Sequence, residues 1–340
     1  MDATKCVRSG GSSAFAKATA DRRSSESGGW SDPPAVGRLV ANVGRVLKFG
    51  PAVIALLATV SLSAQGPAAR GSFADLPGVR LWFTDTGGNG QPIVLLHAAT
   101  GTTESWAPQI EAFAKAGYRV VAFDPRGWGR TVPQPGSGPQ PGTAAEDLDA
   151  LVSFLKLGRF HAVGVAAGAQ MALDYAAWRS DRLASLVLAA TIGPGAEPEV
   201  AAFQKRITVP GLDKLSEEYR EVGPSYRGAN PDGLKRWIEI AHGARPPAAG
   251  DRQPFRLPND YAKLPLVRVP TLLIAADADL LSPPGMMRLW AGRIAGARWA
   301  QVEDAGHSVA WEKPAVFNDL VLRFIKGDRT FPLAADRVNP

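Results

Sequence analysis

Cysteine is almost absent from this chain of 340 residues, in which Cys6 is the only one. A single cysteine excludes a disulfide framework and a thiolate metal site within the chain. It also excludes a cysteine nucleophile once a leader that contains Cys6 is removed. The four histidines are scattered and offer no ligand cluster, so neither a metal nor an organic cofactor is expected.

The net charge is close to zero outside the N-terminal region. The net charge is +6, and residues 1–70 hold nine Lys or Arg against four Asp or Glu. Residues 71–340 hold 29 basic and 28 acidic side chains, without a basic run or interleaved aromatic residues. Nucleic-acid binding is therefore not expected. With 45% hydrophobic residues, the length predicts one elaborated domain behind an N-terminal extension.

The N-terminal region has the composition of a leader. Residues 1–37 are rich in Ser, Gly, Ala and Arg and lack apolar periodicity, which predicts disorder and suggests a start placed upstream of the true one. Residues 38–64 are typical of a signal peptide: two basic residues precede the apolar run 49–62, and Ser63 and Ala64 mark the cleavage region. The run is short for a bilayer span. We expect a periplasmic or secreted protein without a stable membrane span, with an N-terminal membrane anchor as the alternative.

Short β-rich runs alternate with helical patterns from residue 73 to residue 327. This alternation predicts βαβ units and a doubly wound, mostly parallel sheet that is covered on both faces, an α/β fold. Residues 328–340 are expected to form a C-terminal tail. The expected strands are 79–84, 92–97, 118–124, 160–166, 183–190, 271–276 and 298–302, and the clearest helices are 105–116, 143–157 and 167–179.

Motifs in three segments resemble those of the α/β-hydrolase superfamily. The segments are His97-Ala98-Ala99-Thr100-Gly101, Asp124-Pro125-Arg126-Gly127-Trp128-Gly129-Arg130, and Ala305-Gly306-His307 with the following Glu312-Lys313-Pro314 and Phe317. The resemblance covers about residues 73–327 and is strongest to small-molecule members, such as enol-lactonase-like, C–C-hydrolase-like and haloperoxidase-like enzymes. It implies an eight-stranded sheet and a helical cap inserted at about residues 194–263. The cap aromatics form either the cap's own core or an apolar pocket beneath it.

The turn that carries the nucleophile in this superfamily lacks a serine here. Such a turn has the pattern Gly-x-Ser-x-Gly, and this chain has Gly164-Val165-Ala166-Ala167-Gly168. Because alanine has no nucleophilic atom, a covalent acyl-enzyme cannot form at Ala166. Hydroxyls near the oxyanion loop are candidate substitutes, although they more often cap a helix or line a pocket. These are Thr100, Thr102, Thr103 and Ser105.

The remaining catalytic positions implied by the resemblance are occupied. Asp279 follows the strand 271–276 at the position of the acid, with Asp277 as its rival, and His307 lies in the His loop. The backbone N–H groups of Ala99 and Ala167 are the expected oxyanion donors, which a Ser-to-Ala change leaves intact. The expected pocket residues are His97, Ala98, Thr100, Trp106, Trp128 and Trp237. His97 is expected to orient the loop, and packing is the more usual role of the tryptophans.

Two functional hypotheses follow from these residues. In the first, His307 oriented by Asp279 acts as a general base in an enzyme for a small, largely apolar ester, lactone or C–C-bonded carbonyl compound. In the second, the chain is a catalytically inactive pseudoenzyme that binds a small ligand in the retained pocket. A dinucleotide site is not expected because the Gly-x-Gly-x-x-Gly spacing is absent.

Overall fold

The computed structural model describes residues 69–246 and 252–337. The expected extension 1–37 and signal peptide 38–64 lie outside these residues. Among the helices of the described segments, none is both long and apolar enough to cross a membrane.

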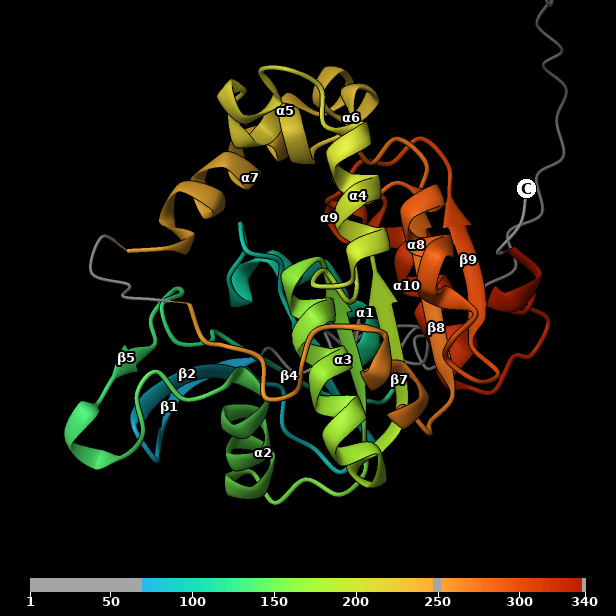
Figure 1. Cartoon of the computed structure of the whole chain (residues 1–340). Coiled ribbons are helices and arrows are strands. Elements are labelled where there is room, and N and C mark those ends of the chain that lie inside the picture. Colours follow the sequence, from blue (N-terminus) through green and yellow to red (C-terminus); the bar gives the residue numbers. More distant parts are fainter. Residues whose placement is uncertain (1–68, 247–251, 338–340) are drawn as a thin grey trace, which may run out of the picture. The chain divides into compact units, whose positions relative to one another are not determined.

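A single sheet organises the described domain (Figure 1). Its strands are β1 (Arg70–Leu76), β2 (Val79–Asp85), β3 (Pro92–Leu96), β4 (Arg119–Phe123), β5 (Val132–Pro133), β6 (Phe160–Val165), β7 (Leu183–Ala189), β8 (Thr271–Ala276) and β9 (Arg298–Val302). Eight of them run in the order β1-β2-β4-β3-β6-β7-β8-β9, and the two-residue β5 pairs with β2 as a ninth. The pairs from β4 to β9 along this order are parallel, whereas β2 pairs antiparallel with β1, β4 and β5. The expected doubly wound, mostly parallel α/β sheet is confirmed.

Helices cover both faces of the sheet because its central strands are apolar on both sides. In β6, Phe160 and Ala162 join one core cluster and Val163 and Val165 the other, as expected for alternating side chains. The first cluster is covered by α2 (Ala144–Phe154), α3 (Ala167–Arg179) and α8 (Pro284–Ala291), and the second by α1 (Ala107–Lys115) and α10 (Pro314–Ile325).

The domain extends beyond its expected limits at both ends. Strand β1 begins at Arg70, three residues before the expected start, and pairs with β2 along its whole length. At the other end, Phe331 and Ala334 are buried, and the amide of Trp299 donates a 2.9 Å hydrogen bond to the Pro332 carbonyl. The segment 328–337 is therefore packed against β9 and is not a free tail.

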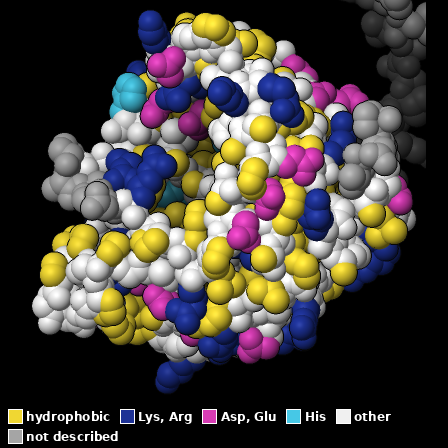
Figure 2. All heavy atoms as spheres, viewed as in Figure 1, with side chains coloured by type: hydrophobic (Ala, Val, Ile, Leu, Met, Phe, Trp, Pro, Cys, Tyr) yellow, Lys and Arg dark blue, Asp and Glu magenta, His cyan; other side chains and the backbone are white. Residues whose placement is uncertain are grey.

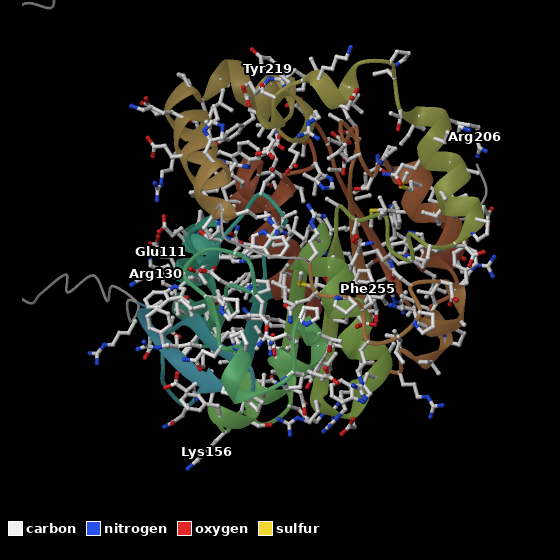
Figure 3. All side chains as sticks on the ribbon, turned by 60° about the vertical axis from the view of Figure 1, so that its left-hand side comes forward. Glu111, Arg130, Lys156, Arg206, Tyr219 and Phe255 are labelled. Atoms are coloured by element: carbon white, nitrogen blue, oxygen red, sulfur yellow. The ribbon has the colours of Figure 1, made fainter. Side chains whose placement is uncertain are left out.

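In the described residues between β7 and β8, four α-helices occupy the region where the cap was expected. They are α4 (Pro198–Ile207), α5 (Glu217–Glu221), α6 (Pro224–Ala229) and α7 (Pro231–Ala244). Trp237 is buried and packs with Val222 and Ala241 in a small apolar cluster. Tyr219, by contrast, is 52% exposed and lies at the outer edge of this region (Figure 3). Phe203 and Tyr261 pack instead against the main core beneath the cap. On the outer surface of this region acidic and basic side chains are interspersed (Figure 2).

Candidate active site

The turn between β6 and α3 has the strained geometry of a nucleophile elbow. Ala166 has φ 53° and ψ −117°, a conformation rare for residues with a Cβ. The flanking glycines are required by close packing: a Cβ on Gly168 would lie 2.1 Å from the Leu96 carbonyl oxygen, and one on Gly164 would lie 2.6 Å from the Ala169 Cα. The elbow therefore keeps its shape although Ala166 presents only a methyl group.

The two expected oxyanion donors lie on adjoining backbone segments. Ala167 is the first residue of α3, so the helix supplies no acceptor for its amide. Ala99 follows β3, which ends at Leu96. The backbone of Leu96 lies against Gly168. Within the residues that the structure describes, neither amide donates a hydrogen bond to the protein. Both are available to a ligand oxygen.

His97 and Trp128 hold the loop that carries Ala99. The Trp128 indole N–H donates a 2.7 Å hydrogen bond to the Ala99 carbonyl, and His97 Nδ1 donates one of 2.7 Å to the Ala98 carbonyl. Burial lowers the pKa of His97 despite the nearby Asp124, so the ring is neutral and serves as a donor. Trp128 is not among the residues that line the pocket described below, which corrects its expected place there.

His307 and Asp279 form the hydrogen-bonded pair that the spacing suggested. His307 Nδ1 lies 2.9 Å from Asp279 Oδ2. The other oxygen, Oδ1, accepts from the amides of Leu281 (2.8 Å) and Ser282 (2.9 Å). The rival acid, Asp277, instead accepts a 2.7 Å hydrogen bond from the Asp304 amide. The acid beside the ring is therefore Asp279.

Ser282 is a fully buried residue that contacts both members of this pair, and the sequence analysis missed it. Its hydroxyl donates a 2.7 Å hydrogen bond to Asp279 Oδ2 and lies 3.2 Å from His307 Nδ1. The hydroxyl therefore orients the acid on the Nδ1 side of the ring. The other ring nitrogen, Nε2, is the one that faces substrate in such a pair. The signal was its place three residues after Asp279, a spacing at which a hydroxyl can return to the carboxylate.

The charge state of His307 is set by the carboxylates around it. Burial opposes protonation of the ring, but Asp279, with Glu221 and Glu312, outweighs it and raises the pKa of His307 to about 9. Burial also raises the pKa of Asp279, but the His307 charge and the hydrogen bonds from His307 and Ser282 lower it by more. The pKa of Asp279 is therefore below its usual range. The resting pair at neutral pH is an imidazolium and a carboxylate.

This raised pKa makes stability depend on pH in a defined direction. Because the folded pKa is near 9 and the ordinary value is 6.5, the stabilisation by His307 is complete below about pH 6.5 and is lost as the pH rises through 9. We expect the difference in unfolding free energy between the wild type and His307→Gln to shrink by on the order of 2 kcal/mol between about pH 6 and pH 10. Urea denaturation at both pH values measures it. A difference that stays constant would contradict the charge state assigned to the ring.

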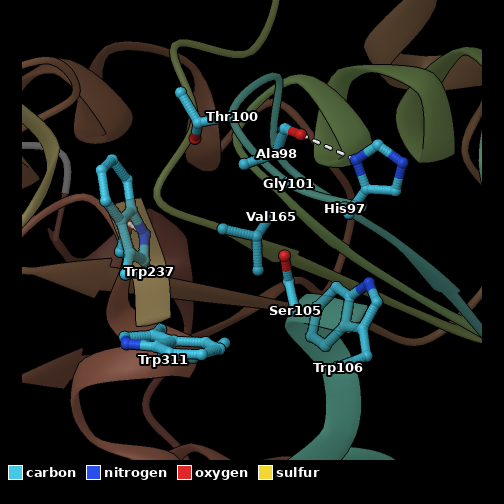
Figure 4. A pocket seen from close by; sticks show the side chains of 11 residues that line it. His97, Ala98, Thr100, Gly101, Ser105, Trp106, Val165, Trp237 and Trp311 are labelled. Atoms are coloured by element: carbon cyan, nitrogen blue, oxygen red, sulfur yellow. Dashed lines mark hydrogen bonds between the residues drawn. The ribbon is translucent and has the colours of Figure 1, made fainter. Parts of the chain in front are cut away.

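An apolar pocket is lined by Ser308, the residue after His307, and by side chains of the oxyanion loop and the cap (Figure 4). Of the expected pocket residues, His97, Ala98, Thr100, Trp106 and Trp237 line it. The sequence analysis missed Trp311, on the short helix α9 (Val309–Glu312) four residues after His307. Its only signal was its place close after His307, because His307 precedes α9 and shares no helix face with it. Three tryptophans thus make up much of the wall.

The hydroxyls of three of the four candidate substitutes, Thr100, Thr102 and Ser105, are engaged in other hydrogen bonds. Thr102 Oγ1 accepts from the Glu104 amide, and Ser105 Oγ accepts from the Thr102 amide, both at 3.2 Å, in a capping box. Thr103 offers its amide to Asp124 at 2.7 Å, and Thr100 donates to a cap carboxylate. In the described part of the chain, the only hydroxyl hydrogen-bonded to His307 is that of Ser282. Groups of His, Cys, Asp or Glu suited to a metal ion are absent from residues 69–246 and 252–337.

Comparisons with known proteins agree with this geometry. Residues 93–320 match the model of the "Alpha/beta hydrolase family". The chain is 30% identical over 256 residues to the "Putative non-heme bromoperoxidase BpoC" of Mycobacterium tuberculosis, covering 71% of this chain and 95% of that one. It is 25% identical over 274 residues to a 2-hydroxy-6-oxononadienedioate/2-hydroxy-6-oxononatrienedioate hydrolase of Burkholderia vietnamiensis, covering 73% and 91%.

Solved structures show the same similarity. The enol-lactonase from Burkholderia xenovorans LB400 superimposes with a TM-score of 0.62 at 25% identity, covering 75% of this chain and all of that one. Because the family match spans more than half of the sequence and contains the elbow, the acid and the His loop, this chain belongs to the alpha/beta hydrolase family.

Proposed function

We propose that this chain is an enzyme that acts without a serine nucleophile on a small, largely apolar carbonyl compound. The compound is an ester, a lactone or a ketone that is cleaved at a C–C bond. His307 paired with Asp279 transfers protons, and the amides of Ala99 and Ala167 stabilise the oxyanion. The relatives named above as an enol-lactonase and a C–C hydrolase support this substrate class.

The 2.9 Å hydrogen bond between His307 and Asp279 carries the proposal. A binding protein has no use for a buried imidazole that is oriented by a carboxylate with four hydrogen bonds of its own. Burying such a pair opposes folding unless it is fully partnered. Proton transfer to a carbonyl compound requires such a pair together with free amides for the oxyanion and an apolar pocket for the substrate.

The protonated state of His307 shapes the chemistry. A ring with a pKa of about 9 is a proton donor at neutral pH, suited to protonating a leaving oxygen. Its deprotonated fraction is the form that acts as a base, and that fraction grows as the pH rises through 9. A non-covalent reaction of this kind needs both an acid and a base within reach of the substrate.

Hydrolysis of short-chain p-nitrophenyl esters and simple lactones by purified residues 65–340 tests the proposal. We expect turnover by the wild type and a loss of at least about 100-fold in His307→Ala. The matched control is His242→Ala, which changes the same residue type at a position of α7 that does not line the pocket. An inert wild type, or equal activity of both variants, would reject it.

A ligand-binding pseudoenzyme is the second candidate, and the methyl group of Ala166 at the elbow favours it. It predicts an inert wild type that binds ester or lactone analogues with an affinity unaffected by His307→Ala. Isothermal titration with a non-hydrolysable analogue separates the two candidates. We also propose export of the chain, on the basis of the signal-peptide pattern at residues 38–64.

A further inference from the structure

A buried carboxylate from the cap lies beside the candidate active site. Glu221, the last residue of α5, is only 8% exposed. Thr100 Oγ1 donates a 2.6 Å hydrogen bond to its Oε2, and Thr100 lines the pocket. The Glu221 carbonyl accepts a 2.9 Å hydrogen bond from the amide of Ser308, the residue after His307. Glu221 is thus held between the oxyanion loop and the His loop.

The cap is docked at this point by contacts that do not involve the Glu221 side chain. Glu312 Oε2 accepts from the amides of Gly223 and Gly306, each at 2.9 Å. A Cβ on Gly306 would lie 2.5 Å from the Gly223 amide nitrogen, so the two backbones are in direct contact. The Trp237 indole N–H donates a 3.0 Å hydrogen bond to Ser308 Oγ. The cap is therefore anchored without the carboxylate of Glu221.

A neutral acceptor would satisfy Thr100 equally well, and burying a carboxylate opposes folding. The compensating partner is His307: burial raises the pKa of Glu221, while the His307 charge and the Thr100 hydrogen bond act against the rise. The ring is faced by Asp279, Glu221 and Glu312. Glu221 is faced, besides His307, by Glu217 and Arg220 of its own helix. Glu221 is thus linked to the pocket wall through Thr100, and His307 through the adjacent Ser308.

We propose that Glu221 is the base of this site and that His307 is its proton donor, an inference that rests on the proposed function. The Glu221 carboxylate takes a proton from water while the water oxygen bonds to the substrate carbonyl carbon. The resulting oxyanion is held by the amides of Ala99 and Ala167. When the bond from carbon to the leaving oxygen breaks, that oxygen takes the proton of His307, and Glu221 then passes its proton back to the ring through water. The net reaction consumes one water and leaves both side chains in their starting states.

The conservative variant Glu221→Gln tests the role of the carboxylate. Its amide oxygen accepts the Thr100 hydrogen bond, so docking is preserved and only the base is lost. We expect kcat for p-nitrophenyl butyrate to fall by about 100-fold or more with little change in KM. The acidic limb of the rate profile should disappear, because that limb reports the protonation of Glu221. Glu217→Gln is the matched control: it removes the same charge from the same helix and should change kcat by less than about twofold.

Thr100→Val separates chemistry from docking, because it removes the hydrogen bond and keeps the carboxylate. If Glu221 serves only as a docking residue, Glu221→Gln leaves kcat nearly unchanged and is no more damaging than Thr100→Val, and the proposal is overturned. If Glu221 is the base, Glu221→Gln is the more damaging change by at least about tenfold.

A titration that needs no turnover completes the test. The imidazole signals of His307, assigned with His307→Gln, are followed by NMR between pH 5 and pH 10.5. We expect Glu221→Gln to lower the His307 midpoint by about one pH unit. An unchanged midpoint overturns the pairing of the two groups. An inert wild type rejects the proposed function and with it the base role, whereas an active wild type with an equally active Glu221→Gln rejects only the present inference.

Discussion

Ala166→Ser is expected to turn this site into one that forms an acyl-enzyme. The elbow already has the positive φ of a nucleophile position, and the amides of Ala99 and Ala167 do not depend on the side chain at 166. In a serine protease, losing the nucleophile lowers turnover by about 10⁶-fold, so restoring it should recover a large part of such a factor. We expect kcat for p-nitrophenyl butyrate to rise by at least about 100-fold.

The pH dependence of Ala166→Ser follows from the charge of His307. A serine needs a neutral imidazole as its base, and the pKa of His307 is raised to about 9. Acylation should therefore increase as the pH rises through 9, in contrast to the wild-type reaction, which uses the protonated ring. Intact-protein mass after treatment with a fluorophosphonate measures the adduct, and Ala166→Ser with His307→Ala is the control. Absence of an adduct up to about pH 9.5 would show that residue 166 lies out of reach of the ring.

Asp147→Ala is expected to produce the largest loss of stability. Arg126 and Asp147 form a bidentate pair, with Nε to Oδ2 at 2.8 Å and Nη2 to Oδ1 at 2.7 Å, and each side chain is only 5% exposed. The same guanidinium donates to the carbonyls of Pro139 and Pro77, which joins the loop after β5 to the β1–β2 turn. Removing the carboxylate leaves a buried cation without its counter-charge. The free energy of unfolding should fall by about 3–5 kcal/mol.

Urea denaturation of Asp147→Ala measures this loss, and Glu111→Ala is the matched control. Glu111 pairs with Lys115 on the surface, where the Glu111 side chain is 66% exposed, and its removal should lower stability by less than about 1 kcal/mol. A similar, small effect of both changes would mean that water reaches Arg126 in the variant. The activity of the folded fraction should persist, because neither residue lines the pocket.

The fold could be predicted because its signals are local. Strands β8 and β9 and helix α3 have the residues that the sequence predicted. Continuous apolar runs mark strands buried on both faces, and alternation with helices marks a parallel sheet. Strand β1 was missed altogether, since the first expected strand began at residue 79. Its first residues are exposed, and it is defined by antiparallel pairing with β2. The segment 328–337 was mistaken for a tail because its few apolar residues show no period.

The sequence by itself determined the parts of the site that are carried by short motifs: the elbow around Ala166, the loop with Ala99 and the loop with His307. Only the tertiary structure decided which acid meets the ring, because Asp277 and Asp279 follow the same strand and differ only in where a turn directs them. It also placed Glu221, 86 residues before His307, beside the site through backbone contacts between the cap and the His loop. Such a contact has no periodicity and no fixed spacing, since it depends on how two loops meet above the sheet, and no local pattern encodes it.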